Sequence, residues 1–207
     1  MSENWASENL RTIRTLMERT AVYRRALAPV SLVTGIVGVA SSGVGLAVGV
    51  NDSKGFVVWW LVTGVIALVL AFILVRKQAL RADEALWSPP TKRVAEALAP
   101  SLVSGLIVGL TVLGLELDSG WGISFVPVVW MLFFGSALHS AGFFMKRGIR
   151  LLGWIFTATA VIEAVILIIL SDLRNSVAAA HGIMGGVFGG YNLVYCLYLY
   201  LTEKEEV

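Results

Sequence analysis

The sequence predicts an all-α integral membrane protein with six transmembrane helices. Three observations support this: the length of the apolar runs, their near-complete lack of charge, and the placement of Lys and Arg along the chain. Of the 207 residues, 57% are hydrophobic and 14% are charged, and that charged share is well below the ~25% of an average soluble domain. The net charge of only +2 gives no case for nucleic-acid binding.

Six apolar runs alternate with short polar connections. A helix needs about 20 apolar residues to cross the ~30 Å hydrocarbon core of a bilayer, and all six runs are long enough. A β-barrel would need alternating segments of about ten residues, which this sequence lacks. Because a helix pairs its own backbone N–H and C=O groups, we expect six spanning helices. The expected spans are residues 26–51, 55–75, 97–115, 119–145, 151–171 and 175–202.

The basic residues indicate which ends of the spans face the cytoplasm. Of the sixteen Lys and Arg residues, fourteen lie in the N-terminal segment, the connections after the second and fourth spans, and the C-terminal tail. Only Lys54 and Arg174 lie in the alternate connections. Positive charge stays on the cytoplasmic side. We therefore predict a multi-pass protein of the cell's inner (plasma) membrane with both termini in the cytoplasm.

The chain divides into a basic N-terminal segment, three helical hairpins and a short tail. In the N-terminal segment, apolar residues such as Leu10, Ile13 and Met17 recur at helical spacing among arginines. This pattern is typical of an amphipathic helix lying on an anionic membrane surface. The predicted parts are a cytoplasmic amphipathic segment at 1–25, transmembrane hairpins at 26–80, 97–150 and 151–202, and a cytoplasmic tail at 203–207.

An internal duplication appears when the chain is shifted against itself by 71 residues. The matches in register are Ala26-Leu27-Ala28-Pro29 with Ala97-Leu98-Ala99-Pro100, Val57-Val58-Trp59 with Val128-Val129-Trp130, and Gly64 with Gly135. Each copy holds two spans, so both copies enter the membrane from the same side and form a parallel repeat. The third hairpin is a candidate diverged copy. We expect the two aligned prolines to lie in the first turn of a helix, where the missing N–H is tolerated.

The last span is rich in glycines spaced for helix packing. Small residues four apart let neighbouring helices approach closely inside a membrane. They predict either tight packing within the bundle or a contact with a second copy. These residues are Gly182, Gly185, Gly186, Gly189 and Gly190.

Glu163 is the only carboxylate within the six spans. A charge at mid-helix costs roughly 2.5–3.5 kcal/mol on insertion scales, so we expect Glu163 to face the bundle interior. Tyr191, Asn192 and Tyr195 on the last span are its expected hydrogen-bond partners, and His139 is a candidate proton relay. The alternative is a protonated, hydrogen-bonded glutamate with a purely structural role.

No arrangement of residues predicts catalysis, a cofactor or a bound metal. His181 lies at the outer start of the last span, where we expect an interfacial histidine, and its depth is too unlike that of His139 for the two to share one haem. Two functions remain open. One is a small transporter or channel for protons or a small solute, centred on Glu163. The other is a non-catalytic structural or regulatory subunit of a membrane complex. The predicted partners are the lipid bilayer, a second copy or another membrane protein, and no nucleic acid.

Overall fold

The structure is a computed structural model that describes residues 27–81, 86–87, 89–114, 122–145 and 147–203. The amphipathic helix expected within residues 1–25 lies outside the described residues, as does nearly all of the tail. Within the described ranges the chain is helical, with no β-strand. The all-α prediction is therefore confirmed for this part of the protein.

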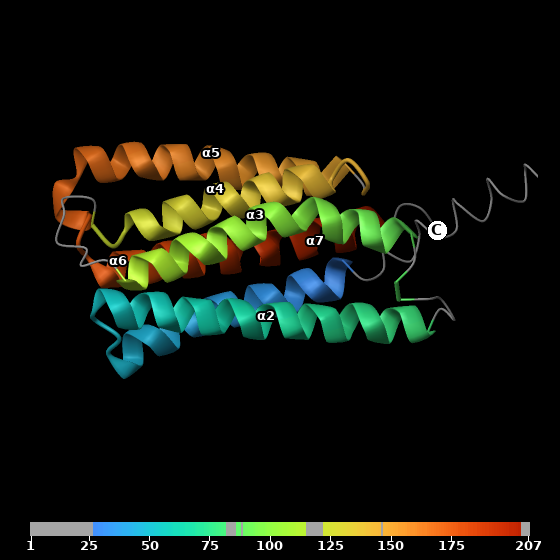
Figure 1. Cartoon of the computed structure of the whole chain (residues 1–207), viewed down its shortest axis with the longest axis horizontal. Helices are drawn as coiled ribbons and strands as arrows, with labels where there is room; N and C mark the ends of the chain where they lie inside the picture. The colour runs from blue at the N-terminus through green and yellow to red at the C-terminus, as the bar shows by residue number, and fades with distance from the viewer. Residues whose placement is uncertain (1–26, 82–85, 88, 115–121, 146, 204–207) are drawn as a thin grey trace, which may run out of the picture.

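The helices follow the predicted spans, with shifted ends. In chain order they are an N-terminal helix Leu27–Val48, α2 Ser53–Arg81, α3 Pro89–Gly114, α4 Phe125–Ala141, α5 Arg147–Ile169, a 3-10 turn Ser171–Leu173, α6 Val177–Met184, a π-helical segment Gly185–Gly190, and α7 Tyr191–Glu203. The last three form one long helix because the π-helical segment follows α6 without a break and passes directly into α7 (Figure 1).

Five helices are long and apolar enough to cross a membrane. They are Leu27–Val48, Ser53–Arg81, Thr91–Gly114, Gly148–Ile169 and Val177–Thr202. Helix α4 is also apolar but has only 17 residues. The outside of the bundle is apolar too, with side chains such as Val48 and Ile169 about 70% exposed. These features are those of an integral membrane protein, because lipid tails rather than water suit such a surface.

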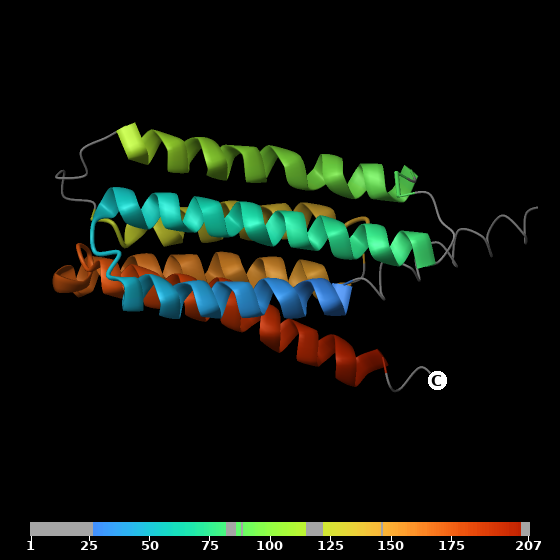
Figure 2. The ribbon, with the colours of Figure 1, turned by 90° about the horizontal axis from the view of Figure 1, so that it is seen from below.

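The helices run along the long axis of a bundle (Figures 1 and 2). Helix α4 packs against both α3 and α5. Figure 2 shows α3 at one side of the molecule, and the N-terminal helix and α7 toward the other side, with α7 diverging from the bundle as it approaches the C-terminus. The described part of the chain therefore has a packed middle and a splayed end.

Glycines bring two pairs of backbones into contact. A Cβ added to Gly153 on α5 would lie 2.7 Å from the carbonyl oxygen of Gly135 on α4. Likewise, a Cβ added to Gly38 on the N-terminal helix would lie 2.8 Å from the Cα of Gly189 in the π-helical segment. Because lipid removes the hydrophobic drive between helices, such close approach is a main source of packing energy in a membrane. Both contacts join helices of different predicted hairpins.

Two clusters of buried side chains form the core. The larger one gathers around Met131, Phe156 and Leu167, between α4, α5 and the last long helix. The smaller one contains Phe56 and Trp60 of α2 together with residues just before α4, at the start of α4 and in α6. The ring of Phe188, in the π-helical segment, packs against both.

The structure tests the first-turn expectation for only one of the two aligned prolines. Pro29 is helical, but the residues before Leu27 lie outside the described ranges, so its place relative to the helix start stays a prediction. Pro100 lies inside α3, which begins eleven residues earlier at Pro89, so the expectation for Pro100 is wrong. The reason is that Pro89 itself suits the start of a helix, and the helix then continues without a break. Because Pro100 has no N–H, the carbonyl of Glu96 loses its intrahelical partner.

Candidate functional site

Glu163 lies on the inward face of α5. Phe156, seven residues earlier, and Leu167, four residues later, share that helical face, and both are fully buried. The Glu163 side chain is itself only half-buried. Within the part of the chain that the structure describes, its carboxylate makes no hydrogen bond and no ion pair. Glu163 is thus an inward-facing carboxylate without a partner in the described ranges.

A pair of hydroxyl groups lies one helical turn from Glu163. Thr159 precedes it by four residues on α5, and the Thr159 Oγ1 lies 2.9 Å from the hydroxyl of Tyr191 on α7. The Tyr191 ring packs edge-on against Phe156, with ring centroids 5.5 Å apart. Either hydroxyl of the pair can be the donor. The structure therefore places Tyr191 beside the Glu163 helix, in contact with the turn next to that carboxylate.

The other two predicted partners on α7 are engaged elsewhere. The Asn192 side-chain amide donates to the Phe188 carbonyl oxygen at 2.7 Å. Tyr195 is buried, and its hydroxyl has no partner among the described residues. That hydroxyl lies by Gly148, where an added Cβ would be 3.2 Å from it. Gly148 is eleven residues from Thr159, about 16 Å along α5. The Tyr195 hydroxyl thus lies far along α5 from the Thr159 hydroxyl, although Tyr195 is one turn from Tyr191 on α7.

His139 lies near the end of α4, against the first half of α5. Its ring meets the rings of Phe143 and Trp154 edge-on, with centroids 5.4 and 5.3 Å away. Its Nδ1 atom is buried and has no partner among the described residues. Trp154 precedes Glu163 by nine residues, about 13 Å along α5. The structure does not bring His139 and Glu163 together.

His181 occupies a sealed junction that the sequence analysis missed. Its side chain is 0% exposed, an enclosure that the expectation of an interfacial histidine did not include. Its Nδ1 accepts a hydrogen bond from the indole N–H of Trp60 at 3.2 Å. An indole N–H can only donate, so the neutral His181 carries its proton on Nε2. That Nε2 makes no hydrogen bond of good geometry in the described ranges, although the Val50 backbone lies near the imidazole.

Three helices close around His181. From the N-terminal helix, the Ser42 hydroxyl donates to the His181 carbonyl oxygen at 2.7 Å. A Cβ at Gly45 would lie 2.6 Å from the His181 Cε1, so only glycine fits there. From α2, the Phe56 ring meets the imidazole edge-on at 5.0 Å. The adjacent Trp60 and the small residues at positions 42 and 45 were the sequence signals that could have predicted this junction.

The five glycines predicted for packing fall into two groups. Gly185 and Gly189 face the N-terminal helix, and a Cβ on Gly189 would lie 2.6 Å from the Val39 backbone nitrogen. Positions Gly182, Gly186 and Gly190 have no heavy atom within 4 Å of an added Cβ. One glycine face therefore packs inside the bundle, and the other lies open on its surface.

Neither a metal-ligand group among the described residues nor a similarity to known proteins points to a function. Within the described ranges, no three His, Cys, Asp or Glu residues are grouped so that they could hold a metal ion. No protein-family model matches the chain, and neither a curated protein nor a solved structure matches it. Its function has to be inferred from its own residues.

Proposed function

We propose that the protein moves protons or a small solute across the membrane, with Glu163 as the group that binds the transported species. One observation carries this proposal: Glu163 shares a helical face with the fully buried Phe156 and Leu167, yet it has no partner among the described residues. A glutamate with a structural role would be expected to have a hydrogen-bond partner. An ionisable group inside a membrane is a functional candidate by default.

The surroundings of Glu163 suit a proton better than a large solute. The adjacent Thr159–Tyr191 pair can reverse its donor direction, so a small rotation can present either a donor or an acceptor toward the next turn. The remaining neighbours on this face of α5 are apolar, including Phe156 and Leu167. A large or highly charged solute would lose its hydration there without replacement. A proton needs only the carboxylate and a short chain of hydroxyls or waters.

The experiment that tests this is a flux measurement in proteoliposomes. Purified protein is reconstituted with a pH-sensitive dye inside the vesicles, a pH step is applied, and the rate of internal pH change is recorded. We expect Glu163→Gln to abolish the protein-dependent flux, because the amide cannot release a proton. The matched control is Glu96→Gln, which removes an exposed carboxylate of α3 that lies 3.8 Å from Lys92. Full flux in Glu163→Gln would refute the assignment.

A second candidate function is that of a non-catalytic structural or regulatory subunit. The open glycine face at Gly182 and Gly186 favours it, since such a face lets another helix approach closely. On this reading the wild-type protein shows no flux in vesicles. It would instead migrate as a defined oligomer or complex after mild solubilisation, and Gly186→Leu would break that assembly.

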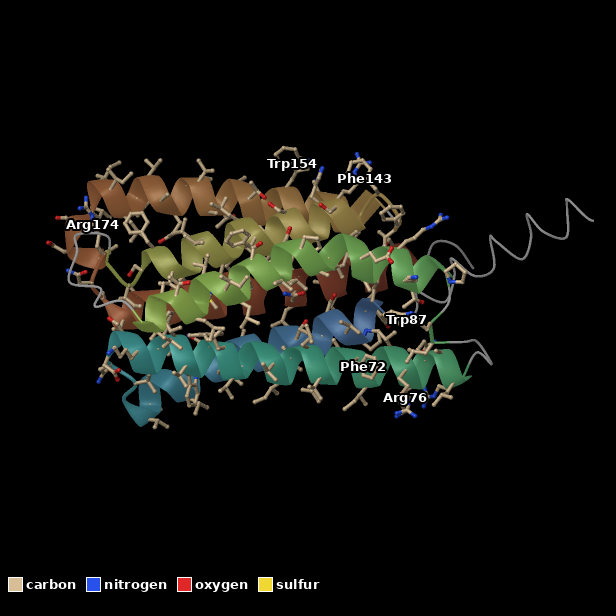
Figure 3. All side chains as sticks on the ribbon, in the orientation of Figure 1. Phe72, Arg76, Trp87, Phe143, Trp154 and Arg174 are labelled. Carbon is tan, nitrogen blue, oxygen red and sulfur yellow. The ribbon has the colours of Figure 1, made fainter. Side chains whose placement is uncertain are left out.

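We further propose six membrane spans, including the short α4, with both termini in the cytoplasm of a plasma-membrane protein. At 1.5 Å per residue, α4 covers about 25 Å. Exposed cations at one end of the bundle support the orientation; they are Arg76, Lys77, Arg81, Lys92, Arg93 and Arg150. At the opposite end (Figure 3), the Arg174 guanidinium donates to the carbonyl oxygens of Leu167 and Ile168, both at 2.7 Å. That arginine caps α5 rather than facing a headgroup.

The proposed parallel repeat finds support in two tryptophans. Trp59 and Trp130 are equivalent at the offset of 71 residues. Each donates its indole N–H at 3.0 Å to a backbone carbonyl of the preceding long helix, namely that of Ser41 and that of Gly105. The equivalent of Ser41 would be Val112, seven residues from Gly105. The two hairpins therefore share the same kind of link, displaced by two helical turns, or about 10 Å.

A further inference from the structure

The first turn of α5 has an unbalanced positive charge. It reads Arg147-Gly148-Ile149-Arg150, follows Lys146, and contains no acidic residue. The N-terminus of a helix is already the positive end of its dipole and presents backbone N–H groups without intrahelical partners. Cations placed there are unfavourable unless an anion lies nearby. The charge pattern of this turn therefore favours an anionic ligand.

Arg150 is held in place by the turn between α4 and α5. Its side-chain stem crosses Gly142, where an added Cβ would collide with the Arg150 Cγ. Its guanidinium carbon lies 4.9 Å from the centre of the Phe143 ring. The side chain is exposed, and no carboxylate among the described residues pairs with it. A guanidinium stacked on an aromatic ring still has N–H donors at its edge, so Arg150 is oriented but unneutralised.

Exposed aromatic rings flank Arg150. Phe143 is 65% exposed and Trp154 is 60% exposed, and Figure 3 shows both on the outer side of the bundle at the same end. The His139 ring lies against both rings, as described above. Tryptophan rings such as that of Trp154 are enriched at the boundary between acyl chains and headgroups. The cation and the rings together match a ligand with a phosphate and a hydrocarbon tail.

We propose that the α4–α5 turn binds an anionic phospholipid of the cytoplasmic leaflet, with the Arg150 guanidinium contacting the lipid phosphate and with Phe143 and Trp154 contacting its glycerol and upper acyl region. Charge complementarity selects this occupant, because Arg150 has no counterion among the described residues and the helix N-terminus adds to its positive potential. The proposal rests on the orientation proposed above. It does not depend on proton transfer at Glu163.

The experiment counts lipids bound to the whole protein by native mass spectrometry. Protein in mild detergent is titrated with phosphatidylglycerol and, separately, with phosphatidylcholine. We expect wild type to retain phosphatidylglycerol selectively and Arg150→Gln to bind it about tenfold more weakly, the effect of losing a charged hydrogen bond. Arg150→Lys should fall between the two, because it keeps the charge but loses the planar fork.

The control is Arg76→Gln, which removes an exposed cation at the same end of the bundle, on α2 (Figure 3). We expect it to bind phosphatidylglycerol nearly as well as wild type.

Two binding results would overturn the proposal. One is equal binding by wild type and Arg150→Gln. The other is an equal loss in Arg150→Gln and Arg76→Gln, which would indicate general charge attraction. Displacement of the lipid by millimolar inorganic phosphate would also overturn it, because the headgroup alone would then be sufficient. If Arg150→Gln does not fold, the Arg150→Lys titration decides in the same way.

Discussion

His181 and Glu163 are two ionisable residues in apolar helices, and the structure treats them in opposite ways. His181 is completely buried, with its Nδ1 bonded to Trp60 and its carbonyl oxygen bonded to Ser42. Glu163 is half-buried and makes no hydrogen bond or ion pair with the described chain. The histidine is part of the packing of three helices, whereas the carboxylate is left available.

This difference shows that depth along a helix and burial within a bundle are separate quantities. Glu163 lies well inside its span, and His181 lies near the end of its own. Yet the residue near the end is the sealed one, because Phe56, Trp60 and Gly45 close around it. A polar group that is fully enclosed stabilises the fold through its bonds, and one left without a partner is free to bind something else.

The largest expected effect comes from the glycine beside the His181 junction. A Cβ on Gly185 would lie 2.6 Å from the Ser42 hydroxyl oxygen, the atom that bonds the His181 carbonyl. Gly185→Leu should therefore push the N-terminal helix away and destabilise the protein by about 3 kcal/mol or more. The measurement is the unfolding midpoint in detergent.

Its control is the next residue of the same π-helical segment. Gly186 has open space around it, so Gly186→Leu should leave the midpoint of the monomer nearly unchanged. If both leucine variants unfold alike, the contrast between the packed and open glycine faces is wrong.

A smaller effect is expected from removing the indole donor. Trp60→Phe keeps the aromatic volume but leaves the buried His181 Nδ1 without its hydrogen bond. An unsatisfied buried acceptor costs about 1–3 kcal/mol, and unfolding in detergent should show a loss of that size. The exposed Trp87 supplies the control, Trp87→Phe, which should be neutral. Adding His181→Leu to Trp60→Phe should recover part of the loss, because it removes the unpaired nitrogen.

The fold followed from the sequence because lipid imposes one strong rule, that backbone groups pair within the segment. Apolar run length therefore predicted the helices, although their ends shifted. The runs could not show that α3 begins at Pro89 and encloses Pro100, since the polar residues of its first turns resemble a connection. Nor could they show that close packing joins α4 to α5 through Gly135 and Gly153, because helix neighbours depend on contacts distant in sequence.

Only part of the site could be predicted from the sequence, because contacts between helices depend on residues that are distant in sequence. Glu163 stands out in any apolar run, and its inward face and the nearby Tyr191 could be anticipated from depth alone. Depth alone did not indicate the burial of His181, because that burial depends on Trp60 from α2 and Gly45 from the N-terminal helix. The side chains of Tyr195 and His139 do not lie beside Glu163. A shared polar character does not bring side chains to the same depth along the bundle axis.

The smallest expected effect on stability is that of Glu163→Gln. The change keeps the side-chain volume, and no described partner loses a bond. Removing a carboxylate that is partly withdrawn from water also relieves part of its desolvation cost. The unfolding midpoint in detergent should therefore match wild type, within about 0.5 kcal/mol of unfolding free energy, or rise slightly. A loss as large as that of Trp60→Phe would mean that Glu163 is a structural group, paired in the folded protein as His181 is. An unchanged midpoint together with abolished proton flux would assign different roles to the two residues. His181 would then stabilise the packing of the helices, and Glu163 would bind the transported proton.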